Sequence, residues 1–309
     1  MKVLVTQMID EVGIAALNAA GLQIDVWPGP APMPRATLLC RLTGCAGIIA
    51  MPTDTIDAEV MDAAPLQVIA NHAVGVDNID LAAAAARGIP VTNTPGVLTD
   101  ATADLAMALL LAVARRVVEG HTLVSAGQFE GWRPTMLRGM ELRGATLGIV
   151  GMGRIGQAVA ARAQAFGMQI IHHSRRSGMP LTQLLSQSDV VSLHCPMTAQ
   201  TRHLIDADAL STMKSTALLI NTARGPVVDE ASLAAALRSG EIAGAGLDVF
   251  EHEPAVHPDL LDLDNAVLLP HLGSATRQTR RRMARLATDN LLAALAGDPL
   301  PSPVDLEHP

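Results

Sequence analysis

The chain has 309 residues, which is enough for two domains of about 150 residues each. Apolar residues make up 49% of it but aromatic residues only 2%, with no Tyr, so aliphatic side chains and Met must fill the core. The net charge is −8, and the 22 basic residues are scattered along the sequence. This distribution argues against nucleic acid or an anionic membrane as a partner.

The three cysteines, Cys40, Cys45 and Cys195, are an odd number without metal-like spacing, so we expect buried thiols and no metal site. Residues 1–6 turn polar too soon for a signal peptide. The longest apolar run, residues 105–114, is too short to span a membrane. Together these features predict a cytoplasmic protein.

The first part of the chain alternates between short apolar runs and helical patterns. A helical pattern over 79–87 ends at Arg87 and Gly88, a typical helix stop, and another covers 10–20. Strands separated by helices pair in parallel through right-handed crossovers. We therefore predict an α/β unit with strands at 3–6, 24–27, 47–50, 68–70 and 90–92.

A long helix is predicted to start near Thr99, with Leu105, Leu109, Val113 and Val117 spaced by four on one face. A polar, glycine-rich stretch covers 127–144. A second α/β series follows, with strands at 145–150, 168–172, 189–194, 217–221, 245–249 and 267–269. A final helix over 276–296 could cross back to the first unit. Two successive doubly wound units are thus expected, with a cleft between them.

A glycine-rich loop joins the first strand of the second series to an amphipathic helix. It consists of Gly151, Gly153 and Gly156, with Arg154 and Ile155 between them. The three glycines allow a tight turn, close approach of a pyrophosphate and close packing of helix on strand. The helix N-terminus adds free N–H groups and a positive dipole end. The strand–loop–helix context favours a dinucleotide site over a ligand-free turn.

The position that selects the dinucleotide lies about 20 residues further on, where NAD sites carry Asp or Glu. This chain has Ser174, Arg175 and Arg176 instead. A hydroxyl and guanidinium groups would bind a 2′-phosphate, so NADP(H) is preferred and NAD(H) stays possible. The alternative is a pair of solvated arginines in an exposed loop.

Three titratable residues, Arg224, Glu253 and His271, each follow a predicted strand of the second series. Ligands of open α/β sheets bind at the carboxyl ends of the strands, so we expect these side chains to converge near the glycine loop. Taken singly, they could be a loop cap, a solvated acid and a core histidine. Together they fit hydride transfer to a carbonyl. His271 would donate the proton, Glu253 would orient and charge the imidazole, and Arg224 would clamp a carboxylate.

The chain resembles the D-2-hydroxyacid dehydrogenase family, and within it the NADPH-dependent glyoxylate/hydroxypyruvate reductases. The motifs that carry the resemblance follow the family's order along nearly the whole chain: residues 73–78, 91–95, 151–156, 221–225, 246–250 and 271–276. The resemblance implies that Arg224, Glu253 and His271 are the catalytic and substrate-binding triad. It also implies reduction of a small 2-oxo acid to the D-2-hydroxy acid.

The resemblance further places Asp248 at the nicotinamide carboxamide, and Thr222 and the Cys195-Pro196 pair beside the cofactor. It implies that the backbone amides of Val74 and Gly75 hold the substrate carboxylate.

A Rossmann-type nucleotide domain, residues 98–276, would be inserted into a flavodoxin-like substrate domain formed by 1–97 and 277–309. The active site would lie in the cleft between these domains. Family members are usually homodimers built on the long helix and the 120–144 segment. Trp132 either reaches the partner's active site or is a plain interface residue.

Two other interpretations stay open. The chain could be a dehydrogenase of the same family that uses NAD and acts on phosphoglycerate, phosphite or formate. Basic residues near Val74 and Gly75 are missing for a phosphorylated substrate, and an acidic residue is missing at Ser174 for NAD. It could also be a nucleotide-sensing scaffold like the corepressors that share this fold. A scaffold would bind NAD(P)H without turning over a 2-oxo acid.

Overall fold

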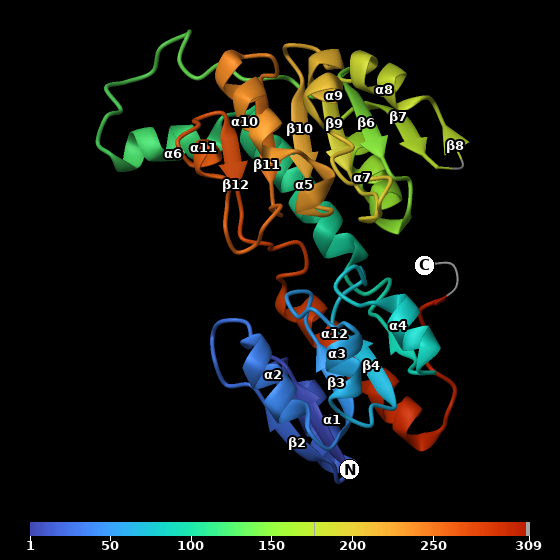
Figure 1. The fold of residues 1–309 in the computed structure, drawn as a ribbon. Helices are drawn as coiled ribbons and strands as arrows, with labels where there is room; N and C mark the ends of the chain where they lie inside the picture. Colours follow the sequence, from blue (N-terminus) through green and yellow to red (C-terminus); the bar gives the residue numbers. More distant parts are fainter. Residues whose placement is uncertain (176, 307–309) are drawn as a thin grey trace. The chain divides into compact units, whose positions relative to one another are not determined.

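The computed structural model describes residues 1–175 and 177–306. It divides into two compact units. Unit 1 comprises Met1–Leu98 and Ala275–Pro309, and unit 2 comprises Thr99–Ser274. Figure 1 follows the chain through both units by colour. No helix of the described residues is long and apolar enough to cross a membrane.

Unit 1 is built on a five-stranded parallel sheet with the order β2-β1-β3-β4-β5. This is the flavodoxin-like order of a doubly wound fold. The strands are β1 (Lys2–Val5), β2 (Gln23–Val26), β3 (Cys45–Ala50), β4 (Val68–Asn71) and β5 (Val91–Thr92). All five lie where the sequence predicts strands. Apart from the edge strand β2, they are nearly continuously buried, which is typical of a sheet covered on both faces.

Helices cover both faces of this sheet. One face packs on α2 (Arg35–Leu42), α3 (Ala58–Asp62) and α4 (Leu81–Ala86). The other packs on α1 (Glu11–Ala19) and on the last helix, α12 (Arg277–Ala296). Thr276 caps the start of α12 and Gly297, at φ 77°, ends it. The final helix thus returns to unit 1, as the sequence indicated.

Unit 2 contains a seven-stranded sheet with the order β12-β11-β10-β9-β6-β7-β8. Every pairing is parallel except β7 with β8, which form a short antiparallel hairpin. The strands are β6 (Thr146–Val150), β7 (Gln169–Ser174), β8 (Ser177–Gly178), β9 (Val190–Leu193), β10 (Leu218–Asn221), β11 (Gly244–Leu247) and β12 (Ala266–Leu268). The order reverses between β6 and β9, so the predicted Rossmann-type, doubly wound sheet is confirmed.

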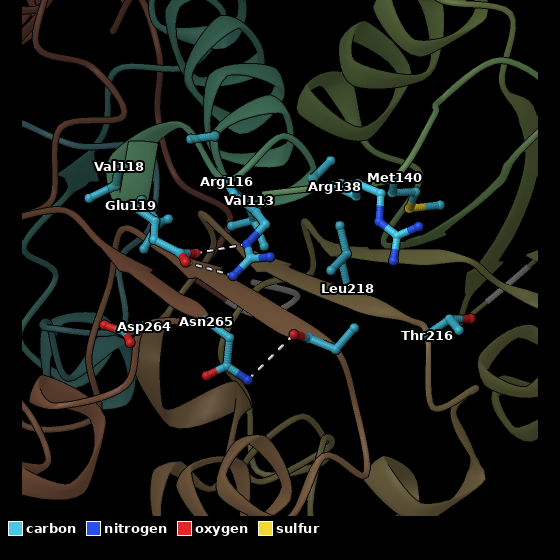
Figure 2. A pocket seen from close by; sticks show the side chains of 15 residues that line it. Val113, Arg116, Val118, Glu119, Arg138, Met140, Thr216, Leu218, Asp264 and Asn265 are labelled. Atoms are coloured by element: carbon cyan, nitrogen blue, oxygen red, sulfur yellow. Dashed lines mark hydrogen bonds and ion pairs between the residues drawn. The ribbon is translucent and has the colours of Figure 1, made fainter. Parts of the chain in front are cut away.

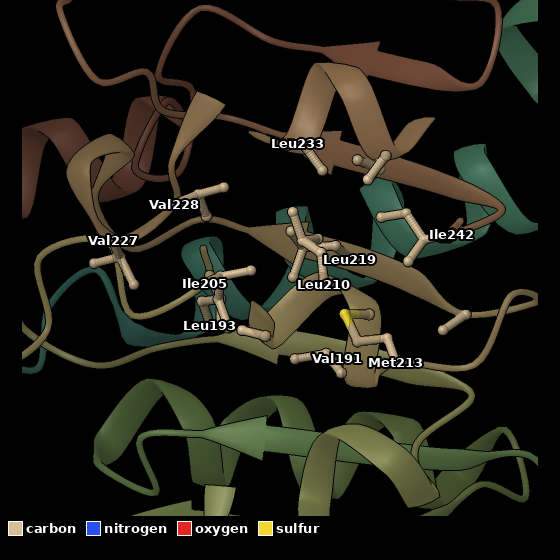
Figure 3. Close-up of a cluster of buried hydrophobic side chains, with 14 of the residues drawn as sticks. Val191, Leu193, Ile205, Leu210, Met213, Leu219, Val227, Val228, Leu233 and Ile242 are labelled. Atoms are coloured by element: carbon tan, nitrogen blue, oxygen red, sulfur yellow. The ribbon is translucent and has the colours of Figure 1, made fainter. Parts of the chain in front are cut away.

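Each face of the second sheet has its own apolar core. On one face α5 (Thr99–Ala114) and α7 (Arg154–Ala165) pack on the strands. On the other face the core is formed with α8 (Leu181–Gln187), α9 (Ala207–Thr212), α10 (Glu230–Ser239) and α11 (Pro258–Leu261). Figure 3 shows this second core, where Leu210 and Leu233 from helices, and Met213 just after α9, meet Val191 and Leu219 from strands.

The prediction of one long helix that includes Val117 is wrong. It ends at Ala114, and Val117 begins a separate helix, α6 (Val117–Ser125). The carbonyl oxygen of Ala114 accepts the N–H of Met140 at 2.7 Å, so it is not available to continue the helix. Gly139 makes this crossing possible, because a Cβ there would lie 2.1 Å from the same oxygen. Val117 is 54% exposed, so it does not extend the buried face of α5.

The expectation of buried thiols holds for Cys45 and Cys195 but is wrong for Cys40, which is exposed on α2. All three cysteines are free.

Candidate functional site

Two glycines of the glycine loop are required by the fold itself, and the third is not. Gly151 follows β6 at φ 98°, and a Cβ there would lie 2.6 Å from the backbone of Cys195. A Cβ on Gly156 would lie 2.2 Å from the carbonyl oxygen of Gly151. Gly153 has an ordinary φ of −78°, and a Cβ there would meet nothing within 4 Å. The free space at Gly153 fits a ligand that approaches the backbone closely.

The start of α7 leaves hydrogen-bond donors free beside this space. No side chain caps the helix, and its first backbone bond runs from Gln157 to Gly153. The backbone N–H groups of Arg154, Ile155 and Gly156 therefore have no intrahelical acceptor. These donors and the dipole end of the helix suit the pyrophosphate of a dinucleotide.

The cofactor-selecting segment forms the hairpin between β7 and β8. The Ser174 hydroxyl donates to the carbonyl oxygen of Ser177 at 3.0 Å and contacts the Ser177 hydroxyl at 2.8 Å. Arg175 is exposed at the turn of this hairpin. Arg176 lies outside the described residues. Among the residues described here, no acidic side chain occupies the end of β7, so no carboxylate there would repel a 2′-phosphate.

The other residues expected beside the cofactor follow β9 and β10, at the same edge of the sheet as the glycine loop. Cys195 packs in the core, and burial raises the pKa of its thiol to about 11, so the sulfur stays protonated at neutral pH. Pro196 is exposed beside it. Thr222 is 8% exposed, and its hydroxyl has no hydrogen-bond partner within the described part of the chain. A buried hydroxyl without a partner is rare and fits a group left for a ligand.

Glu253 and His271 form the pair that the sequence predicts. Nδ1 of His271 lies 2.9 Å from Oε2 of Glu253, and Oε1 of Glu253 accepts the N–H of Phe250 at 3.1 Å. Burial alone would raise the pKa of the Glu253 carboxyl. The hydrogen bond and charge of His271, the Phe250 N–H and the charge of Arg224 outweigh burial and lower this pKa below its ordinary value. Glu253 is therefore an anion at neutral pH.

The backbone around Arg224 is fixed by the last residue of β10. The Asn221 side chain donates to the Arg224 carbonyl oxygen at 2.9 Å and accepts the N–H of Ala223 at 3.0 Å. Nη1 of Arg224 donates to the carbonyl oxygen of Ala223 at 2.9 Å. Gly225 is required next, because a Cβ there would lie 1.9 Å from the Phe250 backbone. The loops that carry Arg224 and Glu253 thus pack directly against each other.

Asp248 has a structural role that the sequence did not indicate. Its side chain is 1% exposed, and its carboxylate accepts the N–H groups of Leu272 at 2.6 Å and Gly273 at 2.8 Å. Its carbonyl oxygen accepts the N–H of His271, which sits at φ 55°, a strained value for a residue with a side chain. Asp248 therefore stabilises the turn that presents His271. Its expected contact with a carboxamide stays a prediction.

A second buried carboxylate fixes the loop of Glu253. Glu230, at the start of α10, is 5% exposed and accepts the N–H groups of Glu251 at 2.6 Å and His257 at 3.2 Å. Sequence reasoning missed Glu230, because its partners lie more than 20 residues away. A buried acid in the first turn of an amphipathic helix is the only signal that could have pointed to it.

The loop of Val74 and Gly75 belongs to unit 1, and its carbonyl groups accept hydrogen bonds from other residues of that unit. The Ala73 oxygen accepts the N–H of Thr94, and the Val74 oxygen accepts the Asn93 side-chain amide, both at 2.8 Å. The Gly75 oxygen accepts the Asn71 side-chain amide at 2.8 Å. In a trans peptide the N–H points opposite to the C=O, so the amides of Val74 and Gly75 point away from these partners. Within the described residues no backbone acceptor is found for these two amides, and such a pair of donors suits a carboxylate.

Unit 2 has two further features, the exposed Trp132 and an open pocket. Trp132 is 79% exposed in the segment that follows α6. The pocket has a volume of about 550 Å³ and is lined by the end of α5, α6, residues 138–140 and the strands beside them (Figure 2). None of the predicted site residues that the structure describes lines it. Within the described residues, no three His, Cys, Asp or Glu side chains are grouped to hold a metal ion.

Comparison with known proteins identifies the family of the chain. The family model described as "D-isomer specific 2-hydroxyacid dehydrogenase, NAD binding domain" matches residues 107–273. A glyoxylate reductase of Korarchaeum cryptofilum is 48% identical over 99% of this chain and 96% of the relative. The chain belongs to the D-isomer specific 2-hydroxyacid dehydrogenase family. It is therefore an NAD(P)-binding oxidoreductase.

Solved structures of this dehydrogenase family agree over the full length. A protein from Thermus thermophilus is 51% identical, with a TM-score of 0.94, covering 99% of this chain and 100% of that one. The NADPH-dependent glyoxylate/hydroxypyruvate reductase of Sinorhizobium meliloti, solved with NADP and malonate, is 38% identical with a TM-score of 0.88. The alignment covers 99% of this chain and 97% of the reductase.

Proposed function

We propose that this dehydrogenase reduces glyoxylate or hydroxypyruvate to the 2-hydroxy acid, of D configuration where it is chiral, with NADPH as cofactor. The observation that carries the proposal is the 2.9 Å pair between an ionised Glu253 and His271. The names of its relatives support the substrate class. The glycine loop and the start of α7 would hold the cofactor, which supplies a hydride to the carbonyl carbon when bound.

Residues of the chain would donate the proton and bind the substrate. Because Nδ1 of His271 faces Glu253, Nε2 is the nitrogen left to donate a proton to the carbonyl oxygen as the C–H bond forms. The Glu253 anion lies behind Nδ1 and fixes the ring in that orientation. The guanidinium of Arg224 would polarise the carbonyl and bind the carboxylate. The backbone amides of Val74 and Gly75 in unit 1 would also bind the carboxylate.

The preference for NADPH rests on the hairpin between β7 and β8. Ser174 ends the strand where NAD sites carry an acid, and Arg175 offers a guanidinium at the turn. Both groups favour a 2′-phosphate. The NADPH-dependent reductase of S. meliloti supports this choice.

A panel of short 2-oxo acids, each assayed with NADPH and with NADH, tests the function. We expect turnover of glyoxylate and hydroxypyruvate, with a higher kcat/KM for NADPH. Binding of NADPH without oxidation by any acid of the panel would replace the proposal with a nucleotide-sensing scaffold.

The proposal includes a homodimer built on α6 and the segment after it. No residue of α6 is buried, which a helix of a folded monomer rarely tolerates. Val117, Val118, Val124, Phe129 and Trp132 are 48–79% exposed within 16 residues of chain. Figure 1 shows α6 and the loop after it extending away from the sheet of unit 2. A second copy that covers this surface would remove the apolar area from water.

Sedimentation of the wild type and of Val124→Asp tests the dimer. A wild type that sediments as a dimer and a variant that sediments as a folded monomer are expected. A monomeric wild type at micromolar concentration would contradict the dimer.

A further inference from the structure

His203 contacts both loops that carry the proposed catalytic groups of unit 2. Its backbone N–H donates to the carbonyl oxygen of Pro226 at 2.8 Å, and Pro226 lies two residues after Arg224. Its ring Nε2 lies 2.6 Å from Oε1 of Glu251, which lies two residues before Glu253. A carboxylate only accepts hydrogen bonds, so Nε2 is the donor of this pair. One residue thus holds the Arg224 loop through its backbone and the Glu253 loop through its side chain.

Glu251 is held at its side chain and at its backbone. The guanidinium of Arg202 donates to the same oxygen, Oε1, at 3.1 Å. The backbone N–H of Glu251 donates to the carboxylate of Glu230 at 2.6 Å. The Glu251 side chain is only 12% exposed, so these charge-assisted bonds define its position closely. Only His252 separates this fixed point from Glu253.

The position of Glu253 matters because a single oxygen of its carboxylate contacts the imidazole of His271. Oε2 lies 2.9 Å from Nδ1 of His271, while Oε1 accepts the N–H of Phe250. Hydrogen bonds depend on both distance and angle. A shift of the Glu253 loop would therefore weaken the contact and leave the His271 ring free to turn.

We propose that His203 and Glu251 are positioning residues for the proton donor. The pair holds Glu253 behind His271 without touching the reacting atoms. This inference rests on the proposed function, because it takes His271 as the group that donates the proton. The Arg224 loop is held separately, by the backbone N–H of His203. The His203 side chain therefore controls proton donation, and binding of the substrate carboxylate by Arg224 does not depend on it.

The test compares His203→Asn with the matched control Lys214→Asn. His203 has a φ of 49°, and Asn is among the few residues that adopt this left-handed conformation readily. The variant thus keeps the backbone N–H in place, but its side chain is too short to reach Glu251. Lys214 also makes a partly buried ion pair in unit 2, with Asp189 at 2.8 Å, but at the amino ends of the strands. For each protein kcat with glyoxylate, the inhibition constant of oxalate, the Kd for NADPH and the melting temperature are measured.

His203→Asn should lower kcat by about tenfold, the rate equivalent of one lost hydrogen bond to a charged group. The inhibition constant of oxalate and the Kd for NADPH should stay within about twofold, because the Arg224 loop and the glycine loop keep their supports. Lys214→Asn should leave kcat unchanged. An unchanged kcat in His203→Asn would overturn the inference. So would an equal loss in both variants, or a tenfold rise in the inhibition constant of oxalate.

A second substitution shows whether the effect passes through Glu253. In Glu253→Ala there is no carboxylate to position, so adding His203→Asn should not lower kcat further. A further tenfold loss would mean that His203 acts by another route, and the inference would be wrong. If His203→Asn does not fold, Glu251→Ala removes the other side of the contact and is judged by the same criteria.

A measurement that needs no turnover separates this inference from the proposed function, which fails if the wild type reduces no 2-oxo acid. Nitrogen chemical shifts of the imidazoles report the tautomer of His271, and His271→Ala identifies its signals. In the wild type the neutral ring should carry its proton on Nδ1, which faces Glu253. His203→Asn should shift the ring towards the Nε2 tautomer, whereas Lys214→Asn should not. A wild-type tautomer in His203→Asn would refute the positioning role.

Discussion

Replacing Glu253 with Gln removes the charge behind His271 and little else. The Gln side-chain oxygen can still accept the hydrogen bond from Nδ1, which spans 2.9 Å. The imidazole would therefore keep its orientation and lose only the nearby negative charge. The variant separates the electrostatic part of the pair from its geometric part.

The size of the effect follows from the exposure of the pair. A hydrogen bond to a charged group contributes about 1.5–3 kcal/mol. The two side chains are 37% and 28% exposed, so solvent screens the pair and the lower end of that range applies, about 1.5 kcal/mol. Since about 1.36 kcal/mol corresponds to a tenfold rate, we expect a loss of about tenfold in kcat.

The assay is kcat for NADPH oxidation with saturating glyoxylate at neutral pH, measured on the wild type and on Glu253→Gln. The variant should have a kcat about tenfold lower than that of the wild type. An unchanged kcat would refute the assignment of Glu253 as the group that supports His271 electrostatically during proton donation.

Further predictions concern the cofactor loop and the acid limb. Gly153→Ala should have a melting temperature within about 2 °C of the wild type, because a surface substitution without a contact costs under about 0.5 kcal/mol. It should nevertheless bind NADPH about tenfold more weakly. Normal binding of NADPH would contradict the phosphate-loop assignment. Gly156→Ala should instead lower the melting temperature, because its Cβ would lie 2.2 Å from the Gly151 oxygen, and an unchanged melting curve would count against this packing. Arg175→Ala should raise the KM for NADPH more than that for NADH, and equal increases would remove the 2′-phosphate argument. The depressed pKa of the Glu253 carboxyl means that the ion pair is complete above its ordinary pKa of 4.5 and is lost only as the pH falls through the lower, folded value. The acid limb of kcat from this group should thus lie below pH 4.5, and one above pH 5 would contradict it.

The sequence was informative wherever local pattern and chain order determine the structure. Apolar runs placed every long strand, because strands buried on both faces must be apolar throughout. The glycine loop was recognisable because strand, glycines and helix follow one another directly. His271 and Glu253 were found because each follows a strand or its loop, and parallel strands bring their carboxyl ends to one edge of a sheet.

The sequence was uninformative wherever a contact with a distant residue determines the local structure. No local sequence signal marks the end of α5 at Ala114, because the group that donates a hydrogen bond to its carbonyl oxygen is the N–H of Met140. The part of Asp248 in holding the His271 turn depends on backbone N–H groups more than 20 residues later. The contact of His203 with Glu251 joins residues 48 positions apart. Such polar contacts depend on three-dimensional placement and have no periodic signature.

The central claim is that His271 donates the proton to the substrate oxygen. The most direct measurement is kcat for glyoxylate reduction by His271→Ala, with the Kd for NADPH measured on the same protein by fluorescence titration. We predict that kcat falls by a factor of about 100 or more, as for loss of a general acid, while the Kd stays within about twofold of the wild type. A variant that binds NADPH normally and keeps the wild-type kcat would contradict the account.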